Sequence, residues 1–377
     1  MSVTSNKNNK ILMIAPQTNS LVNFRGDLIK DIRKRGYDVT VVVPEDDYRG
    51  FFKKNGVKVR LISLDKNSFS VFNTTNYYKC LRKIIEEEKP DKVFSYTIKP
   101  VIFGSLAAHK AGVKEIYSLI CGLGMLFCSN SLKVKMVRSG VGVLYKRALK
   151  YNTRVIFQNI DDVKEFIKRG YVQKKQCCLV SGSGVNMKKF ARNELPDGNV
   201  SFLMVSRVLK EKGVMEYLKA ASIVKNQHPE VSFRYIGPID KNKNALNMNA
   251  IKPYVEDGTV DYIAKTDNVA KYISQCHVFV LPSYYREGIP KTLLEATAIG
   301  RPIITTNTPG CKETVIEGEN GLFVQVKRAN DLAKKMIWMI EHRSKLQKMG
   351  DKSYKLCLEK FTIEKINHRM MEIMEVR

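Results

Sequence analysis

Short runs of β-branched and aromatic residues alternate with helical segments along the chain, and this pattern occurs twice. The first half contains ILMIAP, DVTVVVP, KVRLISL, KVFSYT, EIYSLIC and RVIFQ, and the second half contains SFLMVS, VSFRYIG, VDYIA, VFVLPS, PIITTN and GLFVQV. Strands that alternate with helices form parallel sheets covered on both faces. A chain of 377 residues is long enough for two such domains. We therefore predict an α/β protein built from two doubly wound, Rossmann-like domains.

The polar segment ARNELPDGNV, residues 191–200, is the expected junction between the domains, because it contains proline and glycine and no apolar run. We place an N-terminal domain at residues 1–195 and a C-terminal domain at residues 196–360. Residues 361–377 are expected to form a helix that packs back on the N-terminal domain. Parallel sheets bind ligands at the carboxyl ends of their strands, so the cleft between the domains is the default ligand site.

Composition favours a globular protein without a membrane span or a bound metal. Hydrophobic residues make up 44% of the chain and charged residues 27%. No apolar run is long enough to cross a bilayer, and the first ten residues lack the hydrophobic core of a secretory signal, so we expect a cytoplasmic protein. The eight cysteines form no CxxC pair and are expected to be reduced thiols, and the five histidines stand apart, which argues against a zinc site.

The formal net charge of +27 is concentrated in the first half of the chain. Residues 1–200 carry 36 Lys and Arg against 17 Asp and Glu, whereas residues 201–377 carry 28 against 20. The stretch from Ser131 to Lys150 has six basic residues and no acidic one, interleaved with apolar residues. This pattern predicts an amphipathic helix that docks on an anionic membrane surface. Nucleic acid is the rival partner, and a solvated helix face is the plain alternative.

The stretch SYYREGIPKTLLEATAIGRPI places two carboxylates around a predicted helix start. Pro290 suits the first turn of a helix, so Glu287 precedes the helix and Glu295 lies inside it. Arg286 and Lys291 put cations at the positive end of the helix dipole, a conflict that a bound anion would resolve. This arrangement predicts a phosphorylated ligand. The alternative is that one glutamate pairs with Arg286 and the other lies on a solvated face.

A second candidate phosphate site lies in SFLMVSRVLKEKGVMEYLKAA. A buried strand is expected to end at Ser206, and a helix to start near Lys212, which brings Arg207 and Lys212 to a strand end and a helix start. A lysine in the first turn again opposes the helix dipole. Two such conflicts in one domain suggest one shared anion. The alternative is that Lys212 points into water and Arg207 pairs with Glu211.

Other nucleotide-binding patterns do not fit. GSGVNM and GLGMLF supply two glycines of the dinucleotide fingerprint, but the third position is not glycine, and neither stretch follows the first strand of its domain. The chain lacks a Walker lysine motif. It also lacks spaced aspartates that could hold a metal ion against a diphosphate, so arginine, lysine and helix amides would have to neutralise that charge.

Three blocks in the second half, SRVLKEKG, REGIPKTLLEATAIGRPIITTNTPGCKETV and GENGLFV, resemble the C-terminal domain of family 4 retaining glycosyltransferases, which have the GT-B fold. In the first half, FRGDLIKDIRKRGYDVTVVVP, TIKPVIFGSLAAHKAGV, CGLGMLF, FQNIDDVKEF and SGSGVNMKKF resemble the bacterial branch that builds capsule, O-antigen (lipopolysaccharide) or protein-linked glycans on polyprenyl diphosphate lipids. The resemblance implies two doubly wound domains facing a cleft, with the donor bound by the second domain.

The resemblance also implies roles for single residues. Arg207 and Lys212 would bind the donor diphosphate and stabilise the leaving group, and Glu287 would contact the transferred sugar. Glu295 would accept hydrogen bonds from the nucleotide ribose. Further donor contacts would come from the backbone beside the diphosphate and from the segment along the base, namely Gly288, Ile289, Pro290 and Ile263.

The first half departs from the family pattern in two places. Relatives often carry a glycine pair in the first loop, whereas this chain has TNSLVNFRG, where Asn23 and Arg25 are the candidate donor contacts. Relatives often place a histidine near the sugar at the end of a middle strand, where this chain has Cys121 and Gly122. The residue of the N-terminal domain that contacts the sugar is therefore not assigned.

The resemblance implies a metal-independent enzyme without a cofactor. It would move a hexose or N-acetylhexosamine, with UDP-N-acetylhexosamine as the first candidate donor, to a polyprenyl-diphosphate-linked glycan, with retention of configuration. It would work as a peripheral protein on the inner face of the cell membrane. Two alternatives stay open: a GT-B glycosyltransferase with a soluble acceptor, and a basic nucleic-acid-binding protein, although signatures of common nucleic-acid modules are missing.

Overall fold

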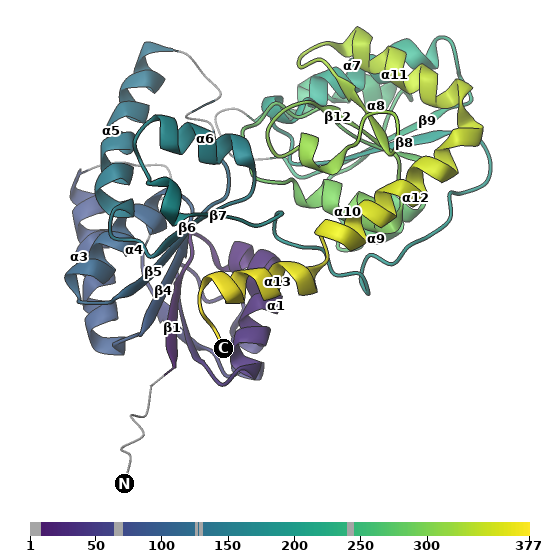
Figure 1. The fold of residues 1–377 in the computed structure, drawn as a ribbon. Coiled ribbons are helices and arrows are strands. Elements are labelled where there is room, and N and C mark those ends of the chain that lie inside the picture. The colour runs from purple at the N-terminus through teal and green to yellow at the C-terminus, as the bar shows by residue number, and fades with distance from the viewer. Residues whose placement is uncertain (1–8, 64–70, 125–126, 128–130, 240–244) are drawn as a thin grey trace. The chain divides into compact units, whose positions relative to one another are not determined.

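The computed structural model describes residues 9–63, 71–124, 127, 131–239 and 245–377. The chain forms two compact units (Figure 1). Unit 1 comprises Met1–Ser183 together with Ile366–Arg377, and unit 2 comprises Gly184–Lys365. Each unit contains one sheet whose strands are all parallel. The predicted class, an α/β protein with two Rossmann-like domains, is confirmed.

The sheet of unit 1 has seven strands in the order β3-β2-β1-β4-β5-β6-β7. The strands are β1 (Lys10–Ile14), β2 (Asp38–Val43), β3 (Lys58–Leu61), β4 (Lys92–Tyr96), β5 (Glu115–Ile120), β6 (Arg154–Phe157) and β7 (Cys177–Leu179). Six of them coincide with the predicted runs. The sequence analysis missed β7, because its three residues, Cys-Cys-Leu, are too few to form a recognisable β-branched run.

Helices cover both faces of this sheet. One layer contains α3 (Val71–Glu88), α4 (Ile98–Lys110), α5 (Leu132–Leu149) and α6 (Ile160–Lys168). The other contains α1 (Thr18–Lys34), α2 (Arg49–Lys54) and α13 (Ile363–Ile373). Alternate residues of β1 face the two layers: Leu12 and Ile14 pack against the first layer, and Ile11 and Met13 pack against the second. Figure 1 shows the two layers on either side of the strands.

The sheet of unit 2 has six strands in the order β10-β9-β8-β11-β12-β13. The strands, all at predicted runs, are β8 (Ser201–Val205), β9 (Ser232–Ile236), β10 (Asp261–Ile263), β11 (Val278–Leu281), β12 (Ile303–Thr306) and β13 (Gly321–Val324). The helices are α7 (Val214–Lys225), α8 (Lys252–Glu256), α9 (Val269–Ser274), α10 (Lys291–Ile299), α11 (Ala329–Glu341) and α12 (Arg343–Lys360). Helix α7 packs beside α11, and α10 packs beside α9 and α12. A single buried core joins them.

Unit 2 begins before the expected junction, at Gly184 instead of residue 196. The reason is local pairing: the Val185 amide donates to the carbonyl oxygen of Phe361, and the Ile363 amide donates to the carbonyl oxygen of Val185. Phe190 is buried in the core of unit 2. The polar composition of residues 191–200 therefore marks an irregular segment within unit 2, and the chain passes between the units a few residues earlier.

The last helix belongs to unit 1. Ile366, Met370 and Met374 of this segment are buried against the same layer as α1. The side-chain amide of Asn367 donates to the Asp31 carboxylate on α1, at 2.8 Å. The chain therefore leaves unit 1 near Ser183 and re-enters it at Ile366.

Helix α5 coincides with the predicted basic helix. It begins after Ser131, whose hydroxyl oxygen accepts a hydrogen bond from the Val134 amide at 3.4 Å. Among the described residues, no helix combines the length and the apolar character that a membrane span requires. Cys128 lies outside the described residues, and the other seven cysteines are free thiols.

Candidate active site

The carboxyl edge of the unit 2 sheet has a topological switch point between β8 and β11. From β8 the chain continues outward to β9 and β10, and from β11 it continues to β12 and β13 on the other side. In open parallel sheets, ligands bind at the carboxyl ends of the strands where the order reverses in this way. The loops that follow β8 and β11 are residues 206–213 and 282–290. They carry most of the sequence-predicted site residues.

Helix α10 starts where the proline predicts. Pro290 is the N-cap residue, with φ −60° and ψ 125°, and α10 runs from Lys291 to Ile299. Gly300 ends the helix in the left-handed conformation. Glu287 therefore lies in the loop before the helix and Glu295 inside it, as predicted. Backbone amides at the start of a helix are typical anion-binding groups, and α7 and α10 both start directly after these two loops.

Lys212 and Glu287 form an ion pair across the switch point. Lys212 is only 8% exposed, so the alternative in which it points into water is wrong. Its ammonium group also lies 5.6 Å from the centre of the Tyr285 ring. A buried ammonium needs a partner, because desolvation strongly penalises an unpaired charge. The predicted convergence of the two loops is thus present in the structure.

Two glycines allow the loops after β8 and β12 to approach the loop after β11 closely. A Cβ atom at Gly213 would lie 2.3 Å from the Pro282 carbonyl oxygen, and one at Gly310 would lie 1.9 Å from the Gly288 carbonyl oxygen. Both glycines have positive φ, at +76° and +90°. The Tyr284 amide donates to the Glu211 carbonyl oxygen at 2.9 Å, which ties the loop after β11 to the loop after β8. The sequence analysis did not identify this role of Gly213 and Gly310.

Glu295 is buried in the second turn of α10, 7% exposed, so it does not lie on a solvated face. Burial raises the pKa of its carboxyl group to about 7, and the nearby cations Lys291 and Lys189 oppose that rise. A carboxyl group with a pKa near neutrality at the carboxyl edge of a sheet is a candidate functional group. Hydroxyl donors of a ligand would stabilise its ionised form. The sequence did not indicate Lys189, because it lies about a hundred residues before the motif and only the fold brings it near Glu295.

The remaining predicted residues of unit 2 lie along the same edge. Arg207 is exposed and follows β8, and Ile263 is the last residue of β10 and is half-buried. Gly288, Ile289 and Pro290 are buried in the loop that enters α10. The structure thus places Arg207, Lys212 and Glu287 at the carboxyl ends of the neighbouring strands β8 and β11, and Ile263 at the end of β10, with β9 between β10 and β8.

In unit 1 the switch point lies between β1 and β4. Here Thr97 follows β4 with φ 68° and ψ 164°, a conformation that costs a non-glycine residue of order 1–3 kcal/mol. Nearby, burial raises the pKa of the Cys121 thiol, while the Arg25 guanidinium, within hydrogen-bonding reach, opposes that rise. Arg25 is 2% exposed. Asn23 is exposed on α1, and its side-chain amide donates to Asn19.

The described residues contain no group of three or more His, Cys, Asp or Glu side chains that could hold a metal ion. Positive side chains at this edge of unit 2 include Arg207 and Lys212, and Lys291 and Lys189 lie near Glu295.

Two family models match the chain. Residues 185–356 match the model described as glycosyl transferases group 1, and residues 10–159 match the one described as glycosyl transferase 4-like. Each match corresponds to the core of one unit. Between them the two models account for most of the chain.

Curated relatives and solved structures agree with these matches. The chain is 29% identical to an N,N'-diacetylbacillosaminyl-diphospho-undecaprenol alpha-1,3-N-acetylgalactosaminyltransferase of Campylobacter jejuni, over 85% of this chain and 87% of that protein. It is 27% identical to a UDP-Gal:alpha-D-GlcNAc-diphosphoundecaprenol alpha-1,3-galactosyltransferase of Escherichia coli, over 75% and 72% of the two chains. The crystal structure of Anabaena HepE with UDP and glucose is similar in fold, with a TM-score of 0.76 at 15% identity over 98% of this chain and all of that one (100%).

Proposed function

Since this chain belongs to the group 1 and 4-like glycosyltransferases, with the GT-B fold, we propose that it transfers a hexose or N-acetylhexosamine from a UDP-sugar to a glycan linked to polyprenyl diphosphate. The activities of the two relatives, both on diphospho-undecaprenol substrates, support this acceptor class. The observation that carries the donor half of the proposal is the Lys212–Glu287 pair at the switch point between two helix starts. Retention of the donor's anomeric configuration is part of the proposal.

The donor diphosphate would lie between the loops after β8 and β11, without a metal ion. Lys212, held close to Glu287 in the structure, would stabilise the negative charge that develops on the leaving diphosphate. Arg207 would approach from solvent, and the backbone of residues 288–290 would face the phosphates. Preorganised charges of this kind stabilise a developing anion with little reorganisation.

The two glutamates would contact different parts of the donor. Glu287 would accept hydrogen bonds from hydroxyl groups of the transferred sugar, and its pairing with Lys212 would couple sugar position to diphosphate position. Glu295 would accept hydrogen bonds from the ribose, and Ile263 would lie beside the base. In unit 1 we propose the exposed Asn23 of α1 as a donor contact, and the buried Arg25 of α1 as a group that positions the Cys121 side chain.

We propose attack by the acceptor hydroxyl on the face that the diphosphate leaves. An oxygen of the departing phosphate would take the acceptor proton, so that the glycosidic bond forms as the sugar–phosphate bond breaks. The acceptor's own lipid would hold the reaction at the membrane, and the basic helix α5 would bring unit 1 to the anionic inner surface.

The test is a transfer assay preceded by a thermal-shift comparison of UDP-sugars. We expect one UDP-hexose or UDP-N-acetylhexosamine to raise the Tm, and the same donor to support transfer to an undecaprenyl-diphosphate-linked sugar. The product should carry the donor's anomeric configuration by NMR. Transfer only to sugars without a diphosphate lipid would replace the acceptor proposal with a soluble acceptor, and an inverted product would remove retention.

A further inference from the structure

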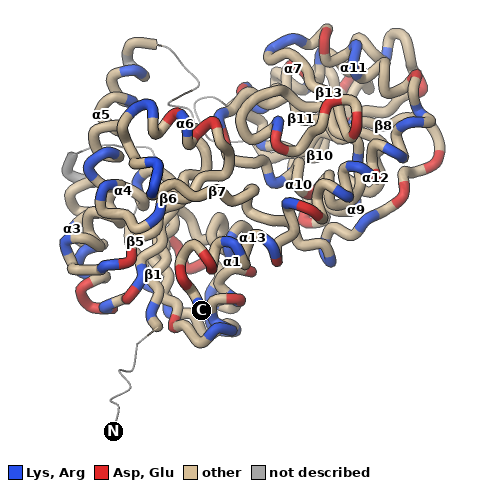
Figure 2. The backbone as a smooth tube through the Cα atoms, in the orientation of Figure 1, with Lys and Arg blue, Asp and Glu red and all other residues tan. Residues whose placement is uncertain are grey.

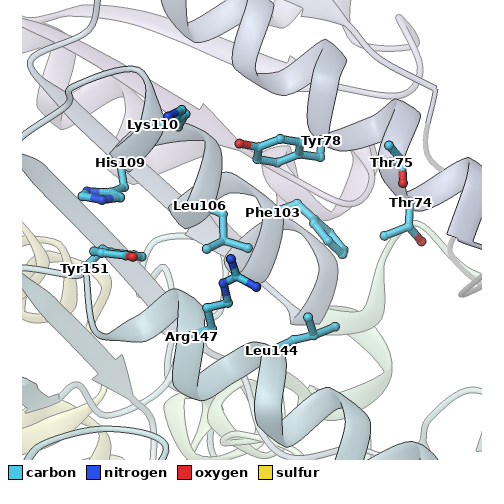
Figure 3. A pocket seen from close by; sticks show the side chains of 10 residues that line it. All are labelled: Thr74, Thr75, Tyr78, Phe103, Leu106, His109, Lys110, Leu144, Arg147 and Tyr151. Carbon is cyan, nitrogen blue, oxygen red and sulfur yellow. The ribbon is translucent and has the colours of Figure 1, made fainter.

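A groove opens in the helical layer of unit 1 among α3, α4 and α5 (Figure 3). Its volume of about 520 Å³ is within the range of small-ligand sites. The groove is lined by Thr74, Thr75, Tyr78, Phe103, Leu106, His109, Lys110, Leu144, Arg147 and Tyr151. None of these residues has a role in the proposed transfer reaction.

The groove has an apolar floor and a basic end. Phe103 and Leu106 of α4 and Leu144 of α5 supply the apolar surface. The basic end of the groove contains Lys110, and the rings of His109 and Tyr151 stack beside it with their centres 3.6 Å apart. Figure 3 shows the Arg147 side chain extending from α5 toward Leu106. An occupant that suits this lining has an anionic group joined to hydrocarbon.

Helix α5 presents an apolar stripe to solvent next to the groove. Leu132, Met136 and Val143 are 78%, 76% and 67% exposed. Their spacing of four and seven residues places them on one face of the helix, opposite the buried Val141 and Tyr145. A contiguous row of large apolar side chains exposed to solvent indicates an interaction surface.

Cations border this stripe. Lys135, Lys146, Arg147 and Lys150 are exposed, and α5 contains no acidic residue. Figure 2 shows Lys and Arg positions along α5 and α4 without acidic neighbours on α5. Apolar residues flanked by Lys and Arg are typical of helices that lie in the interface of an anionic bilayer. Arg147 belongs both to this border and to the groove.

We propose that the groove binds the headgroup of an anionic phospholipid while the α5 stripe lies in the same leaflet. The lipid phosphate would lie between Arg147 and Lys110, and the first methylene groups of its chains would cover Phe103 and Leu106. The charge complementarity and the adjoining apolar stripe favour a lipid over a free phosphate ester, which would leave the apolar floor uncovered. This inference rests on the proposed function at the membrane, and assigns to it a specific lipid site.

The first experiment measures partition onto vesicles of phosphatidylcholine alone and of phosphatidylcholine with phosphatidylglycerol. We expect the double variant Lys110→Ala/Arg147→Ala to lose roughly thirtyfold in affinity for the anionic vesicles only, as two cations near the surface would predict. The matched control Lys53→Ala/Lys54→Ala removes the same charge from α2, in the opposite helical layer. We expect the control to bind within about threefold of wild type. Equal losses in both variants would overturn the lipid site.

The second variant, Leu106→Trp, fills the groove and keeps every charge. If the groove holds a headgroup, this variant should lose about tenfold in affinity for anionic vesicles. Unchanged binding would mean that a diffuse basic face, not the groove, attracts the membrane. Short-chain phosphatidylglycerol below its micelle concentration should raise the Tm of the wild type, whereas an equal or larger rise with glycerol phosphate would assign the groove to a soluble ester.

Transfer to a water-soluble acceptor, measured for all three variants, separates this inference from the proposed function. We expect wild-type rates, because none of the changed residues touches the donor site in unit 2. If the groove variants lose vesicle binding but keep transfer activity, the lipid site is supported. If they keep both vesicle binding and transfer activity, the lipid site is rejected and the proposed function stands. Unchanged far-UV circular dichroism establishes that each variant is folded.

Discussion

At the carboxyl edge of unit 2, the buried Lys212 and the half-buried Glu287 form an ion pair, whereas the same edge of unit 1 carries the strained Thr97 beside the Cys121 thiol. Both edges have the same kind of switch point, with helices following the central strands. A buried ion pair contributes little net stability, but removing one partner leaves a costly unpaired charge. Equivalent topology therefore carries a Lys–Glu ion pair in one unit, and a strained backbone position near the buried Arg25 in the other.

The largest expected effect comes from the charged edge. Lys212→Ala should lower the rate of transfer by about a hundredfold or more, because a preorganised cation at a developing anion contributes on the order of 3 kcal/mol. Glu287→Ala should lower the rate about as much, because it removes the proposed sugar contact and leaves the Lys212 ammonium without its ion-pair partner. The measurement is turnover at saturating donor and acceptor. Asp261→Ala is the matched control, since it breaks the exposed Arg234–Asp261 pair at the start of β10 and should leave turnover near normal. Near-normal turnover of a folded Glu287→Ala protein would remove Glu287 from the mechanism.

The next effect concerns the proton on Glu295. Its pKa is raised from 4.5 to about 7 in the folded protein, so the folded protein keeps a proton that the unfolded chain releases between those two values. Stability contributed by this group therefore falls as the pH rises from 4.5 to about 7 and is constant above that. Glu295→Gln should be more stable than wild type at pH 8 by on the order of 3 kcal/mol, and the difference should vanish near pH 4. Urea unfolding at the two pH values measures it.

The same substitution tests the ribose contact. If Glu295 accepts hydrogen bonds from a nucleotide, UDP should bind Glu295→Gln more weakly than wild type in spite of the greater stability of the variant. Wild-type affinity should also rise with pH up to about 7 and then level off, since binding favours the ionised carboxylate. Equal UDP affinity for both proteins would confine Glu295 to a structural role.

The smallest effect comes from the strained edge of unit 1. Thr97→Gly should raise the free energy of unfolding by about 1 kcal/mol, because glycine adopts this conformation without a Cβ clash. The control is Lys89→Gly, at another positive-φ residue that follows α3 away from this edge. If the strain at Thr97 positions the acceptor, Thr97→Gly alone should lower turnover. Equal turnover of the two glycine variants would show that the strain has no part in transfer.

Local patterns were sufficient to predict much of the fold. The strand runs and the proline at the start of α10 express preferences of neighbouring residues, and the structure confirms them. Ion pairs between residues distant in the chain were harder to predict: Lys212 pairs with Glu287, whereas the alternatives weighed from the sequence paired a glutamate with the adjacent Arg286 and left Lys212 in water. Nothing in TIKP indicates that Thr97 adopts a positive φ, because threonine rarely does so. The groove of unit 1 was not predicted, since it depends on how three separate helices pack.

Helix α13 gives unit 1 an unusual order of assembly. Ile366, Met370 and Met374 cover part of the layer formed by α1, yet they are synthesised after the whole of unit 2. A nascent chain therefore exposes an unfinished apolar surface on its first domain until residues 366–376 have been synthesised. A chain truncated before Ile366 would leave that surface open and would aggregate, even though every proposed donor-binding residue of unit 2 is present.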